Sequence, residues 1–350
     1  MNRFLTPSLI LLMFLISSCE TGRDPGDVDP FAPSLILFAP SNFTESGFQL
    51  NWSLSTLDGF QSIAVEIATD IEMITKVKYV TTEDITSLSI QVDGLKGASQ
   101  YFYRISLLDN GIPVFQSGIR EVYTSYRVDN VDLLTDDSYT LSGKLAYLES
   151  LSGSRPGIIL MHEFGVWVNP WIGSDLMKKL VAEGYVCLTF FNRGHGTSTP
   201  MDDIMDLIND KSLLAKDLQA AIDFMNEHEL VSSGKLGLVG GSMGAIMALA
   251  GNGYQEVLTS VALSPTRNGV FVIFPDMTLS SAYYLVGELD IHDDPDVDFP
   301  AETNALYDLT ETPKKLDIIP ATSDHGSNLL SRDSLNTSIL DWILERNPLE

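Results

Sequence analysis

The stretch Leu238-Val-Gly-Gly-Ser-Met-Gly-Ala-Ile-Met-Ala-Leu249 joins two apolar runs through the pattern Gly-x-Ser-x-Gly, in which Gly240 and Gly244 flank Ser242. The first run is typical of a buried strand, and the second, rich in small residues, is typical of a helix. Glycine at both flanking positions lets neighbouring backbone pass closely without a Cβ clash. Such a strand–turn–helix exposes the serine hydroxyl at the end of a sheet, so we interpret Ser242 as a nucleophile.

The sequence around this stretch alternates short apolar runs with helical patterns. The runs are residues 157–161, 185–191, 236–239, 258–263 and 283–286. Short continuous apolar runs are typical of parallel strands that are buried on both faces. Between them, Leu214, Leu218 and Ile222 recur at helical spacing. Together with an antiparallel pair around Asp136, this alternation predicts a doubly wound, mostly parallel α/β sheet over residues 127–350.

Residues 34–125 have a different pattern, in which apolar and polar residues alternate. The apolar members of one run are Phe48, Leu50, Trp52 and Leu54. A period of two places one face of a strand on a core and the other in water. Turn signals such as Asp109-Asn-Gly111 separate the runs. About seven short strands without a helix predict an N-terminal all-β sandwich.

Three residues of this segment resemble a known module. Trp52 on the second strand, and the spacing from Leu95 to Tyr101, resemble the fibronectin type III family. In that family the Trp fills the core and the Leu-to-Tyr spacing forms a tyrosine corner. The proline expected between them is replaced by Lys96-Gly97. The resemblance implies a spacer, with a glycan-binding platform as the alternative.

The N-terminus has the pattern of an export signal. A basic start, the apolar run 9–16 and small residues predict a signal peptide over residues 1–18. The tetrad Ile16-Ser-Ser-Cys19 resembles a bacterial lipobox, which implies a lipid on Cys19; an ordinary signal peptide with an incidental Cys is the alternative. Residues 19–33 are rich in Pro, Gly and acids and predict a flexible tether. We therefore expect a lipid-anchored protein of the bacterial cell envelope, attached to the outer membrane through the lipid on its periplasmic or surface side.

Composition narrows the class of protein further. The 350 residues are 44% hydrophobic, which is typical of globular domains, and the length fits two of them. The formal net charge of −26 excludes nucleic acid as a partner, because its phosphates would be repelled. Cys187 lies in an apolar run, so we expect a buried thiol without a catalytic role.

Two turns extend the interpretation to a family. His162-Glu-Phe-Gly165 resembles the corresponding turn of dienelactone hydrolase and its relatives in the α/β-hydrolase superfamily. The loop 191–198, Phe-Asn-Arg-Gly-His-Gly-Thr-Ser, resembles one that is common in the same superfamily. Dienelactone hydrolase uses a Cys nucleophile, whereas this chain has Ser. The resemblance implies that the backbone N–H of Phe164 joins that of Met243, the residue after the nucleophile, in an oxyanion hole.

The acid and base of a triad follow from chain order, which in this fold is Ser, then acid, then His. Three of the five histidines precede Ser242, and His292 lies too close to the strand end that should carry the acid. His325 is therefore the predicted base. Asp290, in Gly287-Glu-Leu-Asp290, is the predicted acid, with Glu288, Asp293 and Asp294 as the alternatives.

Other residues are candidates for the walls of the pocket. Trp167 and Trp171 follow the oxyanion turn and are expected either to line the pocket or to pack in the core. Arg193 and His195 are expected to organise a loop beside it. The remaining candidates are His162 and Glu163, the latter as a brace for the turn or the nucleophile. Residues 264–281 are too few for a large lid.

These expectations converge on hydrolysis of carboxylic esters, small or polymer-borne, through an acyl-enzyme. A serine peptidase of the prolyl oligopeptidase type and a non-catalytic surface adhesin are the alternatives. We expect no cofactor and no metal. The acidic stretch 290–298 does not fit a calcium loop of the EF-hand type, because the sixth residue from Asp294 is Phe299 and not Gly.

Overall fold

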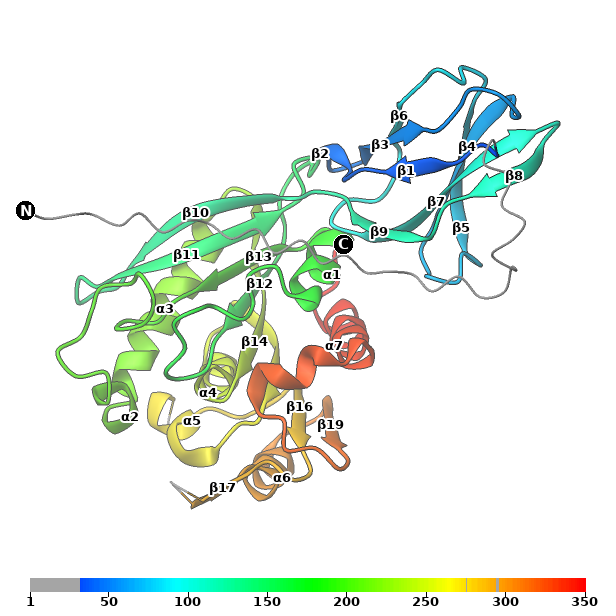
Figure 1. Cartoon of the computed structure of the whole chain (residues 1–350). Helices are drawn as coiled ribbons and strands as arrows, with labels where there is room; N and C mark the ends of the chain where they lie inside the picture. Colours follow the sequence, from blue (N-terminus) through cyan, green and yellow to red (C-terminus); the bar gives the residue numbers. More distant parts are fainter. Residues whose placement is uncertain (1–31, 275, 294–295) are drawn as a thin grey trace, which may run out of the picture.

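The computed structural model describes residues 32–274, 276–293 and 296–350, which form an N-terminal β part and a larger α/β part (Figure 1). The predicted signal peptide 1–18, Cys19 and nearly all of the tether 19–33 lie outside the described residues. Within the described ranges, no helix is both long and apolar enough to cross a membrane.

The N-terminal part consists of two antiparallel sheets. The first contains β1 (Leu35–Leu37), β2 (Ser41–Thr44), β3 (Gly47–Leu54) and β6 (Ser89–Val92). The second contains β4 (Ser62–Ala68), β5 (Lys76–Thr82), β7 (Gln100–Asp109), β8 (Ile112–Gln116) and β9 (Arg120–Tyr123). Side chains from both sheets share one apolar core, so this part is a β-sandwich. The described residues give it more strands than the seven expected, because short edge strands such as β1 carry no clear alternation.

The core of the sandwich follows the predicted period of two on β3 but not on β4. Trp52 is buried, and its Nε1 donates a hydrogen bond to Ser87 O. On β4 the face expected in water is also buried, since Glu66 is covered and pairs with Arg104 and Lys76. The Tyr101 hydroxyl accepts a 2.9 Å hydrogen bond from the Lys96 N–H. The fibronectin type III resemblance stays a prediction.

The α/β part is built on an eight-stranded sheet in the order β10-β11-β13-β12-β14-β15-β16-β19. Its strands are β10 (Arg127–Leu134), β11 (Thr140–Tyr147), β12 (Arg155–Met161), β13 (Val186–Phe190), β14 (Val231–Gly241), β15 (Val257–Leu263), β16 (Ala282–Gly287) and β19 (Lys314–Ile319). β10 and β11 are antiparallel, and the strands from β13 to β19 run parallel. The predicted doubly wound sheet is therefore confirmed. Cys187 is buried on β13, as expected.

Helices cover both faces of this sheet (Figure 1). On one face lie α1 (Asp175–Glu183) and α7 (Asp333–Arg346), with the 3₁₀ turn η2 (Gly326–Ser331). On the other lie α3 (Ser212–Glu227), α4 (Met243–Ala250) and α6 (Phe299–Leu309), with the shorter α2 (Asp206–Asn209) and α5 (Arg267–Ile273). The expected solvated acidic loop instead contains a small hairpin of β17 (Ile291–Asp293) and β18 (Asp296–Asp298). In the parallel sheet, β14 lies between β12 and β15, so its end faces loops from both neighbours.

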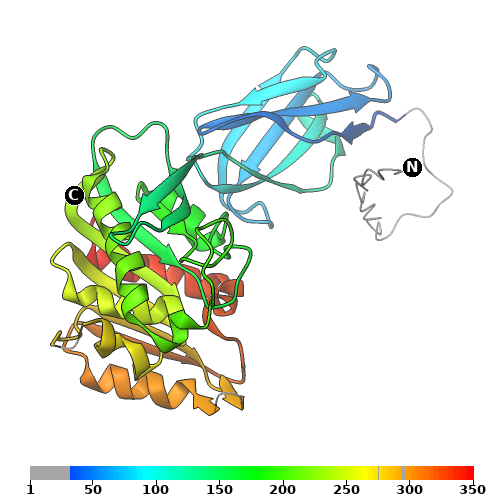
Figure 2. The same cartoon turned by 90° about the vertical axis from the view of Figure 1, so that its left-hand side faces the viewer.

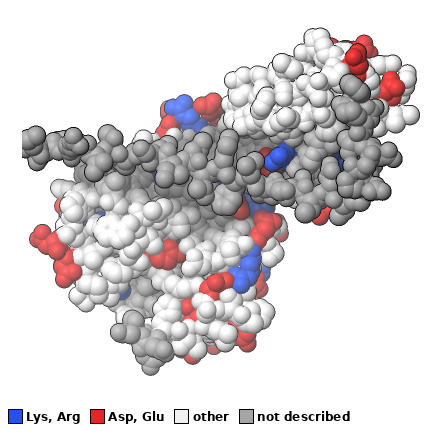
Figure 3. Space-filling view, in the orientation of Figure 1, with Lys and Arg blue, Asp and Glu red and all other residues white. Residues whose placement is uncertain are grey.

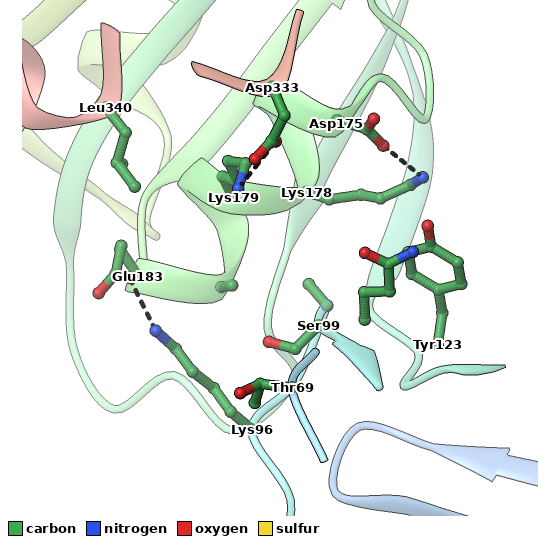
Figure 4. Close-up of a pocket in the computed structure, with 13 residues that line it drawn as sticks. Thr69, Lys96, Ser99, Tyr123, Asp175, Lys178, Lys179, Glu183, Asp333 and Leu340 are labelled. Atoms are coloured by element: carbon green, nitrogen blue, oxygen red, sulfur yellow. Dashed lines mark hydrogen bonds and ion pairs between the residues drawn. The ribbon is translucent and has the colours of Figure 1, made fainter. Parts of the chain in front are cut away.

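The sandwich stands at one end of the molecule, and α6 lies at the other (Figure 2). A cavity of about 350 Å³ separates the sandwich from α1 and α7 (Figure 4). Lys96 of the sandwich crosses it to Glu183 at 2.8 Å, and Lys179 pairs with Asp333 at 3.1 Å. The labelled lysines of this cavity are all paired with carboxylates, and the pair between Lys96 and Glu183 links the sandwich to α1. These lysines therefore offer no unpaired charge to a ligand.

Candidate active site

Ser242 lies on a strained turn at the end of β14. Its φ of 51° and ψ of −110° are unusual for a residue with a side chain. A Cβ on Gly240 would lie 2.0 Å from Gly244 O, and one on Gly244 would lie 2.2 Å from Met161 O. The two glycines are thus required because the backbone passes too closely for any side chain. The Ser242 N–H donates to Leu263 O at 2.8 Å, which fixes the turn against β15.

Asp290 and His325 come together at the same edge of the sheet. His325 Nδ1 lies 2.9 and 3.0 Å from the two carboxylate oxygens of Asp290, which is completely buried. A carboxylate at Nδ1 requires the proton on that nitrogen, which leaves Nε2 as the basic atom. Of the alternative acids, Glu288 is exposed and binds the Ala321 N–H, and Asp294 lies outside the described residues.

Ser264 is a further hydrogen-bond partner of the Asp290 carboxylate. Its hydroxyl donates a 2.6 Å hydrogen bond to Asp290 Oδ2 and accepts one of 3.0 Å from the Gly326 N–H. The same side chain therefore holds the acid and the loop that carries His325. Ser264 was not among the residues predicted from the sequence, although its position directly after β15 matches that of Ser242 after β14.

The turn that carries Ser242 and the loop that carries His325 are close neighbours. A Cβ on Gly241 would lie 3.0 Å from the Ser327 N–H nitrogen, two residues after His325. The Phe299 ring packs on the His325 ring with centroids 4.4 Å apart, and Phe299 shares a cavity with Ser242. The described residues include no hydrogen bond from Ser242 Oγ to His325; catalytic hydrogen bonds are often long before substrate binds.

A cavity of about 420 Å³ opens beside Ser242. Its apolar walls come from Phe164, Ile208, Met243, Ile246, Val297, Phe299 and Ala301. Phe164 and Met243, the two predicted oxyanion donors, therefore face the same space as the hydroxyl. Met243 is the first residue of α4, so its N–H has no acceptor within the helix.

Glu163 contacts both the turn that carries Ser242 and the loop that carries His325. Its Oε1 accepts a 2.5 Å hydrogen bond from the Ser327 N–H, and it would lie 2.3 Å from a Cβ on Gly241. The side chain is wedged between the nucleophile turn and the histidine loop. Its second oxygen, Oε2, is buried without a partner among the described residues.

The two tryptophans proposed as pocket walls do not line the cavity. Trp171 is fully buried and packs in the core with Met177 and Leu180 of α1. Its backbone N–H donates a 3.0 Å hydrogen bond to Asn169 Oδ1, which turns the chain into that core. Trp167 is 68% exposed and is not among the residues that line the cavity. The aromatic walls are Phe164 and Phe299 instead.

The remaining pocket candidates, together with Glu163, are also absent from the cavity walls. His162 Nε2 accepts from the Asn192 N–H at 3.0 Å, and burial lowers the pKa of His162 to about 3. His195 Nε2 accepts from the Gly165 N–H at 2.9 Å. Arg193 is buried and forms ion pairs of 2.8 Å with Asp217 and Asp137. These residues tie the turn that carries Phe164 to the loop after β13.

His292, two residues after Asp290 in the sequence, also lies beside the Asp290 carboxylate. Its Nε2 is 3.3 Å from Asp290 Oδ1, and its ring is half-exposed. The ligand atoms of Asp290, His292 and His325 all lie within 4.8 Å of one another, a spacing at which a divalent cation can bind. Both Asp290 oxygens, however, already accept hydrogen bonds from His325, and one of them also from Ser264. The fit to a metal is therefore poor.

Comparison with known proteins identifies the fold family. A model described as "Alpha/beta hydrolase family" matches residues 158–334. An esterase from Pyrococcus furiosus is 17% identical, with a TM-score of 0.50 over 63% of this chain and 93% of the esterase. The structure of DcsB with a substrate analogue is 16% identical, with a TM-score of 0.50 over 63% and 100% of the two chains.

A dienelactone hydrolase from Anabaena variabilis is 18% identical, with a TM-score of 0.49 over 64% and 99% of the two chains. No curated protein matched the sequence. At these identities the likeness to solved structures concerns the fold alone. The family match spans half of the chain. This protein therefore belongs to the alpha/beta hydrolase family.

Proposed function

We propose that this protein is a serine hydrolase that cleaves carboxylic esters through an acyl-enzyme, with Ser242 as nucleophile, His325 as base and Asp290 as its orienting acid. The observation that carries the proposal is the buried Asp290 carboxylate, bonded to His325 Nδ1 beside a cavity into which the strained Ser242 turn opens. A carboxylate in that position fixes the tautomer of the imidazole and stabilises the imidazolium that forms during the reaction.

The proposed reaction has two stages. Ser242 Oγ attacks the ester carbonyl while His325 Nε2 takes its proton, and the N–H groups of Phe164 and Met243 bind the oxyanion. His325 then gives the proton to the departing alkoxide, which leaves as an alcohol and the acyl-enzyme remains. Water attacks the acyl-enzyme with its proton passing to His325, and the carboxylic acid is released as Ser242 regains its hydrogen.

The cavity favours an ester with an apolar acyl or alcohol chain, since aliphatic and aromatic side chains form most of its walls. We also propose that a lipid on Cys19 anchors the enzyme to the bacterial cell envelope and that the sandwich acts as a spacer, with glycan binding as the alternative. Mass spectrometry of the intact protein from membranes tests the first point: a Cys19→Ala variant that still carries the lipid would contradict it.

Burst kinetics with p-nitrophenyl acetate test the catalytic assignment. We expect a rapid release of one equivalent of p-nitrophenol, labelling by a fluorophosphonate probe, and loss of both in Ser242→Ala. Ser233→Ala is a matched control, because Ser233 is exposed at the start of the same strand and should leave the burst intact. An undiminished burst in Ser242→Ala would overturn the proposal, as would cleavage confined to aminoacyl-prolyl amides.

A further inference from the structure

Lys211 is a buried cation in the wall of the cavity that contains Ser242. It directly precedes α3, its residue is 8% exposed, and it lines the same space as Phe164 and Met243. Its methylene chain packs on Gly269, where a Cβ would lie 3.3 Å from Lys211 Cε. The side chain is thus held in place by packing and not free to extend into solvent.

The ammonium group of Lys211 has little to bind within the protein. Its one hydrogen bond among the described residues is a long one, 3.4 Å from Nζ to Leu207 O. No carboxylate of the described residues forms an ion pair with it, and burial lowers the pKa of Lys211. An ammonium has three N–H donors, and a buried charge without a partner is costly.

The acidic residues that line the same cavity are already occupied. Glu302 forms a bidentate ion pair with Arg267, with a closest distance of 2.9 Å. Asp298 caps α6 by accepting a 2.9 Å hydrogen bond from the Ala301 N–H. Lys211 is thus the buried charged group of this cavity that has no ionic partner among the described residues, whereas Glu302 is paired and Asp298 is exposed.

This positive charge is unusual for so acidic a chain. The sequence has 47 Asp and Glu against 21 Lys and Arg, and acidic side chains lie at several separate places on the face in Figure 3. The surface as a whole repels anions. The Lys211 ammonium attracts an anion to the cavity, whereas the acidic surface around it does not.

We propose that Lys211 binds a carboxylate of the substrate, so that the enzyme prefers esters that carry a negative charge a few carbon atoms from the scissile bond. This proposal rests on the proposed ester hydrolysis and names its substrate class. Charge-assisted hydrogen bonds from Nζ fix one end of the substrate. The apolar wall formed by Ile246 and Phe299 accommodates the carbon chain between that carboxylate and the ester at Ser242.

Matched pairs of esters test the preference. In the first pair the charge is on the acyl side: mono-p-nitrophenyl adipate against the same ester with a carboxamide in place of the distant carboxylate. In the second it is on the alcohol side: 4-acetoxybutanoate against 4-acetoxybutanamide. We expect kcat/KM to favour the acid in one pair by about 10- to 100-fold, the effect of a hydrogen bond to a charged group.

The variant Lys211→Met keeps an unbranched side chain of similar length and removes the charge, so the ratio of acid to amide should fall at least about tenfold. Lys179→Met is the matched control: it removes a positive charge from α1, which packs on the opposite face of the sheet, and should leave the ratio unchanged. A wild-type ratio near one in both pairs would overturn the proposal, and this measurement needs no variant. An unchanged ratio in folded Lys211→Met would show that the lysine only fills space.

Calorimetry with adipate separates this proposal from the catalytic one. Adipate should bind to Ser242→Ala and lose at least about tenfold in affinity when Lys211→Met is added. If the wild-type enzyme cleaved no ester yet bound adipate through Lys211, the proposed reaction would be wrong and the anion site right. Adipate binding that is equal with and without Lys211 would refute the anion site, whatever esters are cleaved.

Discussion

Two buried charged clusters lie beside the sheet, and they differ in what remains free. In the arginine network, Arg193 is bound by Asp217 and Asp137 through both its backbone and its guanidinium. In the histidine–aspartate site, Asp290 is equally buried, but its partner His325 remains partly exposed. In the arginine network, each of these charged groups is paired with a group of opposite charge. In the second, the His325 ring packs on Phe299, which lines the cavity that contains Ser242.

The difference teaches how to separate structure from chemistry in a buried cluster. The carboxylates of the arginine network have adapted to their roles within it: hydrogen bonds from Arg193 lower the pKa of Asp137, and burial raises the pKa of Asp217 to about 6. Neither group faces the cavity that contains Ser242. A substitution in the histidine–aspartate site should therefore lower activity, whereas a substitution in the arginine network should lower stability.

The sharpest test of this contrast is Asp290→Asn. We expect kcat to fall by about 10³- to 10⁴-fold, because the amide no longer fixes the tautomer of His325 or stabilises its charged form. The melting temperature should change little. Glu288→Gln is the control, since Glu288 is an exposed acid two residues away that binds only the Ala321 N–H. A larger loss in Glu288→Gln would move the acid to that residue.

Arg193→Met should give the opposite result. Removing the guanidinium leaves Asp217 buried without its counter-charge, at a cost of about 3–5 kcal/mol in the free energy of unfolding. Urea denaturation followed by circular dichroism measures it. The double variant Arg193→Met, Asp217→Leu should recover much of that stability, because no buried charge is left. If the double variant recovered no stability, the unpaired charge of Asp217 would not be the source of the loss.

His162 extends the comparison to pH. Its pKa is about 3 in the folded protein and about 6.5 when unfolded, so the unfolded state takes up the proton first as the pH falls. Stability is therefore lost as the pH falls below 6.5, by about 2–3 kcal/mol between pH 7 and 4.5. Urea unfolding at both values should show a smaller loss in His162→Gln. An equal loss in the variant would mean that other groups carry the acid sensitivity.

Ser264→Ala is expected to have the smallest effect. It leaves Asp290 Oδ2 and the Gly326 N–H each without one hydrogen bond, which corresponds to about 1–2 kcal/mol and about a tenfold loss of kcat/KM. Ser260→Ala is matched to it: Ser260 is also buried on β15 and donates to Ala248 O. That variant should lose stability while keeping its kcat/KM, and equal activity losses in both would remove the special role of Ser264.

Local patterns in the sequence predict much of this fold. The parallel strands follow from continuous apolar runs, and the turn at Ser242 follows from two glycines that no other residue can replace. Chain order then singles out His325 as the proposed base and favours Asp290 as its acid over Glu288, Asp293 and Asp294, since the fold requires an acid and a base after the nucleophile. Such features depend on residues near one another in sequence, and local chemistry is enough to predict them.

The cavity was decided by the tertiary structure alone. Its walls come from α2, α4, α5 and α6, which are distant in sequence, and no local pattern shows which side chains of separate helices will share a space. Nearness in sequence to the oxyanion turn left two roles open for Trp167 and Trp171, because it does not fix the direction of a side chain; in the structure Trp171 packs in the core, and neither residue is a wall of the cavity. Lys211 and Ser264 gained their importance only from burial and from partners brought in by folding.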